Sequence, residues 1–479
     1  MPTIFVDGRE IQAEKEQTVL EAAIANGCEL PYFCYHPALS IAGSCRVCVV
    51  QVEGRSWVEI GCNMPVSEGL RVLTDSDLVR EHRAAMLELT LLNHPVDCGI
   101  CDKAGECTLQ DYHYKYNGKP SVSVDAKVHA TKYHELGPRV ILDNERCILC
   151  SRCVRFTREI SKTNSLGIQQ RGDHSLVRAS EDGAFERDAY SDNVVDICPV
   201  GALLSRSFLH RARVWYLEPT PSVCPGCARG CTVQIWHRKQ EWKLHALDPA
   251  KNTRIERVTP LETPKVNGPW ICNKGRDLPK IFERPRALQP MLHGSPVALD
   301  VAIAAARDLV AGAERPVALV SSWGSNEEIA AFAASLGARF AAFVKEDHLA
   351  QPGEVVEDAL LIRADKNPNS AAALARFPAW NGAFDAAADL VLVWGEGASG
   401  ARFPAGAKVI RLDSYDRPEL AAADVFIPVS IQTERSGHYT SFEGVVSRFS
   451  RCFPKADSVA DAEALFAALA AHADKEAAA

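Results

Sequence analysis

The sequence has no apolar run long enough to span a bilayer, and its most apolar stretch, residues 329–344, is interrupted by Arg339. The N-terminal stretch MPTIFVDGREIQAEKEQ has neither a basic start nor a long apolar core, so we expect no signal peptide. The chain also lacks an excess of basic charge: the formal net charge is -8, which argues against a nucleic-acid partner. We therefore expect a soluble chain, which leaves open its attachment to a membrane complex.

Two further absences bear on the chemistry. No G-x-G-x-x-G motif opens a clear helix, and the glycines of WGEGASG are residues that any turn after a strand needs, so we place no NAD there. No cysteine lies between Cys272 and Cys452, so we expect no cysteine-ligated metal in that part of the chain.

Cysteine, in contrast, is abundant. The chain has 17 cysteines but no export signal, and disulfide-rich chains are usually small and secreted. Clustered cysteines in a reducing compartment more often hold a metal or do redox chemistry. Fifteen of the 17 fall into spaced groups that end at Cys272, whereas Cys28 and Cys452 stand alone and are expected to be small core residues.

The first 61 residues predict a small sheet with one helix. Residues 3–6 and 10–11 form a predicted hairpin around the Asp7-Gly8 turn, and a helix begins after Thr18. Strands follow at residues 47–53 and 57–61. This order, with a cysteine loop after the helix, resembles a β-grasp ferredoxin.

The first cysteine group occupies this loop. Its members are Cys34, Cys45, Cys48 and Cys62. Plant-type ferredoxins have the spacing C-x4-C-x2-C, whereas here ten residues precede the C-x2-C pair and thirteen follow it. A zinc site is the alternative, although zinc sites favour two C-x2-4-C pairs and the predicted β-grasp favours an iron–sulfur cluster.

The second group follows a predicted helix at residues 78–93 and has the pattern H-x3-C-x2-C-x5-C. Its members are His94, Cys98, Cys101 and Cys107. A lone histidine after a helix is more often a cap or a surface residue. Here three cysteines at ligand spacing need a fourth partner, which favours His94 as a ligand. A Cys3His zinc site is the competing interpretation.

The third group gives the strongest signal, because RCILCSRCVRF contains a C-x2-C-x2-C run typical of bacterial ferredoxins. The run consists of Cys147, Cys150 and Cys153, and Cys198-Pro199 comes after 44 intervening residues. The chain has only one such run, so Cys198 most economically completes the same cluster. Neither zinc nor disulfides explain this combination.

The fourth group has a C-x2-C-x3-C start in CPGCARGC and a distant last member. It contains Cys224, Cys227, Cys231 and Cys272, the last after 40 residues that include a hairpin-like stretch at 233–247. Zinc remains an alternative here. Beyond Cys272, alternating strands and helices predict a parallel, doubly wound sheet. An alanine-rich helix with a frayed end is predicted for residues 460–479.

The blocks SIAGSCRVC, NHPVDCGICDKAGECTLQD, RCILCSRCVRF and DICPVGAL resemble those of the large iron–sulfur subunit (the G subunit) of respiratory complex I. The resemblance implies one [2Fe–2S] cluster on the first group and [4Fe–4S] clusters on the second and third. The fourth group is similar to an extra [4Fe–4S] site that some bacterial members keep. Residues after Cys272 resemble a shortened molybdopterin-oxidoreductase domain, for which we expect no molybdopterin and a scaffolding role.

The expected fold is therefore multidomain, α+β followed by α/β. We expect a β-grasp [2Fe–2S] ferredoxin domain at 1–78, a helical Cys3His [4Fe–4S] segment at 79–119 and a bacterial-ferredoxin-like [4Fe–4S] domain at 120–216. A molybdopterin-oxidoreductase-like [4Fe–4S] domain is expected at 217–280 and a shortened molybdopterin-oxidoreductase-like doubly wound α/β domain at 281–479.

By this resemblance the chain transfers electrons and has no NADH or quinone active site of its own. The implied partners are an NADH/FMN-binding flavoprotein subunit, a [2Fe–2S] small subunit and quinone-module subunits, on the cytoplasmic face of the inner membrane. The alternatives are the electron-transfer subunit of a soluble NAD-linked hydrogenase, formate dehydrogenase or electron-bifurcating complex, a Mo- or W-dependent oxidoreductase, and a zinc-rich scaffold.

Overall fold

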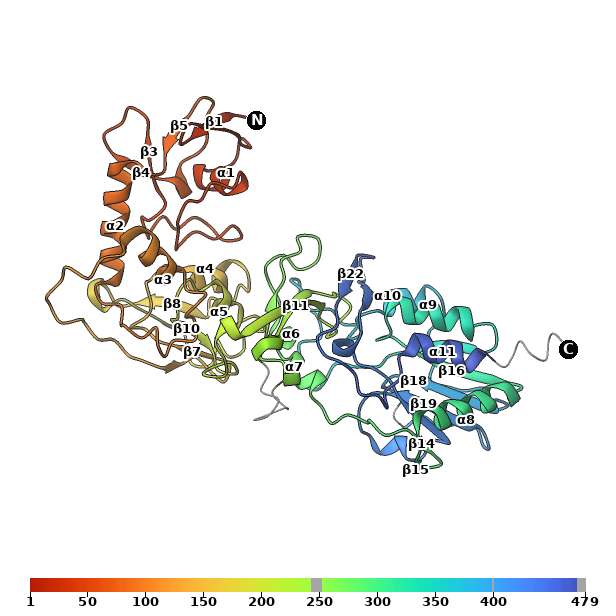
Figure 1. The fold of residues 1–479 in the computed structure, drawn as a ribbon. Coiled ribbons are helices and arrows are strands. Elements are labelled where there is room, and N and C mark those ends of the chain that lie inside the picture. The colour runs from red at the N-terminus through yellow and green to blue at the C-terminus, as the bar shows by residue number, and fades with distance from the viewer. Residues whose placement is uncertain (243–251, 399, 472–479) are drawn as a thin grey trace. The chain divides into compact units, whose positions relative to one another are not determined.

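The computed structural model describes residues 1–242, 252–398 and 400–471 of the chain (Figure 1). The chain folds into two compact units, which consist of Met1–Tyr216 and Leu217–Ala479.

The first unit begins with the predicted β-grasp sheet. Its five strands lie in the order β2-β1-β5-β3-β4, with β1 parallel to β5 and the other pairs antiparallel. The strands are β1 (Thr3–Val6), β2 (Arg9–Gln12), β3 (Val49–Val52), β4 (Val58–Ile60) and β5 (Arg71–Leu73), with a 3-10 turn, η1 (Gly61–Asn63), after β4. The predicted strands and the turn at Asp7-Gly8 are thus confirmed.

Helix α1 (Val19–Ala25) packs beneath this sheet. Its start is fixed by a capping box: the N–H of Glu21 donates to the Thr18 hydroxyl at 3.3 Å, and the Glu21 carboxylate accepts from the Thr18 N–H at 2.7 Å. Gly27 follows the helix with a φ of +71°, the left-handed conformation that glycine adopts at helix ends. The predicted helix start at Thr18 is confirmed, and the chain then enters the first cysteine loop.

The rest of the first unit consists of short elements around the second and third groups. The helices are α2 (Asp77–Leu91), α3 (Thr108–Tyr112), the π-helix η2 (His113–Asn117), α4 (Arg152–Glu159), η3 (Gly172–His174), α5 (Asn193–Ile197) and η4 (Val214–Tyr216). The strands are β6 (His134–Glu135), β7 (Val140–Leu142), β8 (Leu166–Gln169), β9 (Leu176–Ala179) and β10 (Leu203–Ser205). Helix α2 lies against β3 (Figure 1). The buried Arg83 of this helix donates to the Val49 carbonyl at 3.3 Å and to the Thr74 carbonyl at 3.1 Å.

The second unit opens with an antiparallel three-stranded sheet, β11-β12-β13. Its elements are β11 (Leu217–Val223), β12 (Thr232–Arg238), η5 (Gln240–Trp242) and β13 (Arg257–Pro260), followed by α6 (Asn273–Arg276) and α7 (Leu278–Phe282). The hairpin-like stretch predicted at 233–247 corresponds to β12 as far as Arg238, and its last residues lie outside the described part of the chain.

The predicted doubly wound sheet follows. Five parallel strands lie in the order β17-β16-β18-β19-β20, and a two-residue antiparallel hairpin, β14-β15, extends the β20 edge. The strands are β14 (Met291–Leu292), β15 (Ser295–Pro296), β16 (Pro316–Ser321), β17 (Ala341–Lys345), β18 (Leu390–Trp394), β19 (Lys408–Asp413) and β20 (Val425–Pro428). The remaining elements are α8 (Leu299–Gly312), α9 (Asn326–Ser335), α10 (Ser370–Leu374), η7 (Pro418–Leu420), η8 (Gln432–Glu434), β21 (Gly437–Thr440), β22 (Val446–Phe449) and α11 (Ala462–Ala470).

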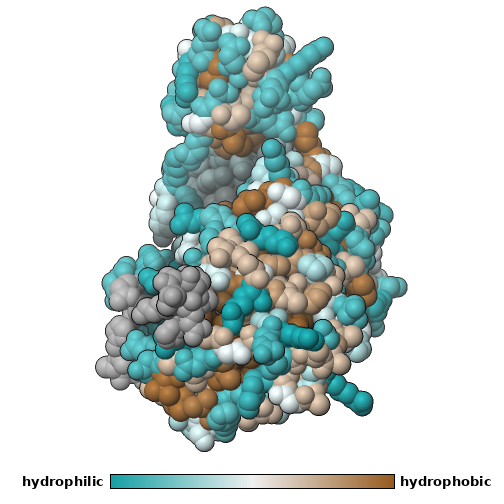
Figure 2. Space-filling view, turned by 90° about the vertical axis from the view of Figure 1, so that its right-hand side faces the viewer, coloured by the Kyte–Doolittle hydropathy of each residue, from teal (hydrophilic) through white to brown (hydrophobic). Residues whose placement is uncertain are grey.

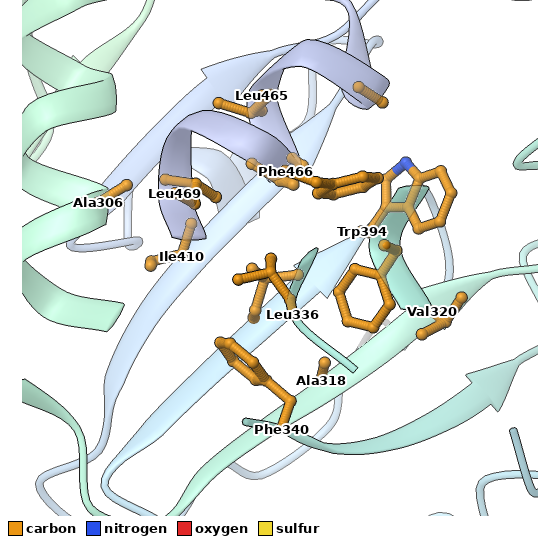
Figure 3. Close-up of a cluster of buried hydrophobic side chains, with 14 of the residues drawn as sticks. Ala306, Ala318, Val320, Leu336, Phe340, Trp394, Ile410, Leu465, Phe466 and Leu469 are labelled. Carbon is orange, nitrogen blue, oxygen red and sulfur yellow. The ribbon is translucent and has the colours of Figure 1, made fainter. Parts of the chain in front are cut away.

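The main core of this unit lies between the parallel sheet and helices α8, α9 and α11. Figure 3 shows side chains of α11 directed at the sheet, where Phe466 packs edge-on against Trp394 with ring centroids 4.9 Å apart. The opposite sheet face is covered by aromatic side chains from loops, among them Trp380, Phe384 and Phe403. The predicted C-terminal helix is confirmed as α11, and residues 472–479 lie outside the described chain.

No helix among the described residues is both long enough and apolar enough to cross a membrane. The face of the molecule shown in Figure 2 carries hydrophilic and hydrophobic residues side by side.

Candidate functional site

The structure brings the four thiols of the first group together at one end of the β-grasp sheet. The Cys34 thiol is hydrogen-bonded to the thiols of Cys45 and Cys62, and the Cys62 thiol is also hydrogen-bonded to that of Cys48. These bonds lower the pKa of Cys34, and they raise the pKa of Cys45 and of Cys62, which burial raises further. The Ser44 hydroxyl adds another hydrogen bond to Cys34. The four sulfur atoms therefore lie together at one site, where they can share an anionic charge.

The second group lies between α2 and α3. Cys101 is buried, Cys107 is partly buried and Cys98 is exposed. Burial raises the pKa of Cys101 and raises that of Cys107 to about 11, while neighbouring thiols act in the same direction. These three thiols are close enough to influence one another electrostatically, as ligands of one site would be.

His94 stands beside this group in a state suited to metal binding. Burial, together with the positive charge of Arg146, lowers its pKa to about 4, so the imidazole is neutral at pH 7. Its Nδ1 atom is buried and has no hydrogen-bond partner among the described residues. A buried polar atom without a partner is costly, and ligation of a metal would remove that cost. Arg146 also acts on Cys101, so the two lie in one neighbourhood.

The third group is assembled by strand pairing. Strand β7 leads into Cys147, and β10, which follows Cys198, pairs antiparallel with β7 in the register Leu203↔Leu142. This pairing returns Cys198 to the earlier run across 44 residues. A cavity there is lined by all four cysteines, Cys147, Cys150, Cys153 and Cys198. Burial raises the pKa of Cys147 to about 12 and that of Cys150 to about 11, so neutral thiols are favoured until a metal binds.

The loop that carries the third group is held in an uncommon backbone conformation. Leu149 and Ser151 have φ values of +51° and +58°, in the left-handed region that costs a side-chain-bearing residue on the order of 1 kcal/mol or more. The turn points the Leu149 N–H back at the Cys147 sulfur, 3.4 Å away. Strain of this kind is typical of loops whose shape serves a bound group.

The same N–H to sulfur bond recurs two residues after other cysteines in the groups. Lys103 donates to Cys101, Arg152 to Cys150, Gly226 to Cys224 at 3.5 Å, and Lys274 to Cys272. Hydrogen bonds to sulfur are one of the means by which proteins set the potential of iron–sulfur clusters. The pattern was not predicted, because it depends on local backbone angles rather than on cysteine spacing.

The fourth group is also brought together, in the second unit. Cys224 and Cys231 are linked through their backbones at 2.7 Å, and Cys272, just before α6, influences both electrostatically. Burial raises the pKa of Cys224 and raises that of Cys272 to about 11, with Cys227 contributing in both cases. The long interval before Cys272 is thus bridged by the sheet β11-β12-β13.

The two remaining cysteines lie outside these groups. Cys28 packs at the edge of the β-grasp core, and burial raises the pKa of Cys452 to about 12. Among the described residues, no three His, Cys, Asp or Glu side chains form a group that could hold a single metal ion. Ligands of a polynuclear cluster bind different irons and need not converge on one atom.

The turn after β18 behaves as the sequence indicated. Gly395 and Gly397 have φ values of +80° and +83°, and a Cβ on Gly395 would lie 2.7 Å from the Asp347 carboxylate. Between them, Glu396 forms a two-bond ion pair with Arg284 at 2.9 and 2.6 Å. The two glycines are thus required by the packing of this turn. The adjoining cavity is about 60 Å³, room for a few water molecules.

Comparison with protein-family models gives four matches in chain order. Residues 1–77 match the 2Fe-2S iron-sulfur cluster binding domain and residues 83–121 the NADH-ubiquinone oxidoreductase-G iron-sulfur binding region. Residues 137–204 match the ferredoxin-like domain of NADH-quinone oxidoreductase subunit 3, and residues 217–284 the molybdopterin oxidoreductase Fe4S4 domain. The chain therefore contains 2Fe-2S and 4Fe-4S binding domains.

Curated relatives agree with these matches. The chain is 36% identical over 276 residues to the NADH-quinone oxidoreductase G subunit of Rickettsia typhi, covering 58% of this chain and 39% of the relative. It is 36% identical over 292 residues to the mitochondrial NADH dehydrogenase [ubiquinone] iron-sulfur protein 1 of Solanum tuberosum, covering 61% and 38%. The chain thus spans about two fifths of the length of these relatives.

A chain in a crystal structure of an NAD+-reducing [NiFe]-hydrogenase is 33% identical, with a TM-score of 0.40, over 44% of this chain and 91% of that one. Over the 58–61% of its length that aligns with the curated relatives, this chain is a homologue of the iron–sulfur G subunit, or 75 kDa subunit, of complex I.

Proposed function

We propose that this chain is the electron-carrying iron–sulfur subunit of an NADH:quinone oxidoreductase. In this role it receives single electrons from an NADH- and FMN-binding partner subunit and passes them toward quinone-reducing subunits. The observation that carries the proposal is the convergence of four separate cysteine groups, each with the residues and spacing of an iron–sulfur site. Bound clusters would each accept and release one electron; the chain itself supplies their ligands, burial and hydrogen bonds.

We assign the [2Fe–2S] site to the first group and [4Fe–4S] sites to the other three. The ligands are Cys34, Cys45, Cys48 and Cys62; His94, Cys98, Cys101 and Cys107; Cys147, Cys150, Cys153 and Cys198; and Cys224, Cys227, Cys231 and Cys272. The residues present fit these groups: the thiols are gathered, backbone N–H groups point at sulfur, and His94 keeps a buried nitrogen without a partner among the described residues. No molybdopterin is assigned to the α/β sheet, which we propose to be a scaffold.

The assignment to complex I is tested in the cell that makes the protein. A tagged chain should co-purify with a membrane-bound quinone-reducing complex, and NADH should bleach its iron–sulfur absorption. Purification with a soluble hydrogenase or formate dehydrogenase instead would contradict the complex I assignment while preserving electron transfer. A preparation containing zinc and no iron would contradict both.

A further inference from the structure

Helix α4 carries two arginines that are both buried beside the third cysteine group. Arg152 and Arg155 are three residues apart, so their side chains leave the same face of the helix. Arg152 is 9% exposed and Arg155 is 4% exposed. Arginine is rarely so buried without a specific partner, so the contacts of these two side chains indicate their purpose.

Arg155 joins the first cysteine group to the third. Its Nη2 atom donates to the backbone carbonyl of Cys34 at 2.5 Å and to that of Cys150 at 3.3 Å. Its Nη1 donates to the carbonyl of Ser40, within the same loop as Cys34, and its Nε donates to the Ser151 hydroxyl at 3.2 Å. One guanidinium thus binds the backbones of two proposed ligands that belong to different clusters.

Arg152 also joins the first group to the third, through residues that adjoin one proposed ligand of each group. Its Nη2 donates to the carbonyl of Tyr35, next to Cys34, at 2.6 Å. Its Nη1 donates to the carbonyl of Ile197, next to Cys198, at 3.0 Å. The two guanidinium groups together therefore occupy the space between the first and third groups.

The contacts leave the positive charge of both side chains uncompensated. In the described parts of the chain, neither Arg152 nor Arg155 forms an ion pair with a carboxylate, and their acceptors are neutral carbonyl and hydroxyl oxygens. Glu159 influences Arg155 electrostatically, but its carboxylate is hydrogen-bonded by Ser40 and Arg158 rather than by Arg155. Burying a charge is costly unless an opposite charge lies close by.

Iron–sulfur clusters held by four thiolates supply such a charge. Their net charge is negative and becomes more negative by one unit on reduction, and net charge is one of the determinants of potential. Two buried cations next to two such sites stabilise the reduced form of each, because Coulomb interactions are strong where water is excluded.

We propose that Arg152 and Arg155 form a cationic bridge between the first and third cysteine groups that raises the reduction potentials of both clusters together. The inference rests on the proposed function, since it requires clusters at both groups. The two arginines act as positioning and tuning residues: they hold the loop of Cys34 against that of Cys150 and supply the charge. The clusters at the second and fourth groups lie outside this bridge.

The test is an EPR-monitored redox titration of the full chain, prepared anaerobically, with iron content measured on each sample. Arg155→Gln should lower the midpoint potentials of the [2Fe–2S] cluster and of one [4Fe–4S] cluster together. The reduced-to-oxidised ratio at fixed potential should fall at least tenfold, equivalent to about 59 mV for one electron. Arg155→Lys, which keeps the charge, should retain most of the wild-type potential.

Arg158→Gln is the matched control. Arg158 lies on the same helix, its side chain is 58% exposed and it pairs with Glu159, so it should shift neither potential. Arg152→Gln provides a second route to the same joint shift if Arg155→Gln binds less iron. Unchanged potentials in iron-replete Arg155→Gln or Arg152→Gln, or an equal shift in all clusters, would contradict the proposed cationic bridge and leave the proposed function intact. Wild-type protein without reducible clusters would instead overturn the proposed function.

Discussion

Gly201, three residues after Cys198, packs directly on the sulfur of Cys101, and a Cβ atom at this position would overlap that sulfur. The loop that completes the third cysteine group therefore also forms one wall of the second. Arg146, next to Cys147, bonds to Asp97, next to Cys98, in the same region. The second and third groups therefore share a wall and an ion pair.

Replacing Gly201 by alanine should displace Cys101 and cost the second cluster. We expect about four fewer irons per chain and loss of one [4Fe–4S] EPR signal. Gly167→Ala is the matched control, because Gly167 has no atom within 4 Å of the added Cβ and no left-handed backbone. Equal iron contents in the two variants would show that close packing of Gly201 on Cys101 is not required for the second cluster to bind.

Cys272→Ser should remove only the fourth cluster. The three other groups lie in the first unit, and the main core of the second unit is formed by the α/β sheet and its helices rather than by these thiols. Iron should fall to about ten per chain from about fourteen, with three EPR signals kept. An unchanged iron content would mean that the fourth site is empty or uses another ligand.

Arg146 should contribute strongly to the stability of the first unit. The side chain is 2% exposed and its guanidinium lies 2.9 Å from the Asp97 carboxylate and 3.2 Å from the Asp143 carboxylate. Arg146→Met leaves the buried Asp143 with Lys132, 3.5 Å away, as its remaining cation, so the cost should fall below the roughly 3–5 kcal/mol of a fully unpaired buried charge. Urea-induced unfolding of the first unit, compared between the variant and the wild type, measures the loss of stability. Adding Asp143→Asn to Arg146→Met should recover part of it, and strict additivity of the two changes would count against direct pairing.

The contact between Glu159 and Ser40 predicts acid sensitivity. Burial raises the pKa of Glu159, but hydrogen bonds from the Ser40 hydroxyl at 2.6 Å and N–H at 2.8 Å outweigh it and hold the pKa at about 2, below the usual 4.5. A carboxyl with a lowered folded-state pKa contributes stability that is complete above its unfolded pKa. That contribution is lost as the pH falls from about 4.5 toward 2.

Ser40→Ala should therefore flatten the decline in unfolding midpoint between those pH values, measured by thermal melts in matched buffers. The comparison with Glu159→Gln separates the hydrogen bond from the charge. A decline as steep in both variants as in the wild type would assign the acid sensitivity to other groups.

The elements that sequence predicted well are those whose signals are local. The hairpin at Asp7-Gly8 and the capped helix after Thr18 depend on neighbouring residues alone, and both appear where expected. The parallel sheet also follows from strands that alternate with helices along the chain. The strands β14 and β15 were not predicted, because two-residue strands show no periodicity.

The ligand groups could be proposed from spacing, but their surroundings could not. Nothing in RCILCSRCVRF shows that Arg152 and Arg155 are buried, since arginine is ordinarily a surface residue. Their burial depends on the loop of Cys34, more than 100 residues away in sequence. The position of Gly201 against Cys101 depends in the same way on the pairing of β7 with β10.

The central claim is that the four cysteine groups hold iron–sulfur clusters that carry electrons. Low-temperature EPR of the dithionite-reduced full chain, with spin quantification and iron and sulfide analysis, tests it most directly. We predict one [2Fe–2S] and three [4Fe–4S] signals with about fourteen irons and a matching amount of acid-labile sulfide. A colourless protein without sulfide and without EPR signals, or one that contains zinc in place of iron, would contradict the claim.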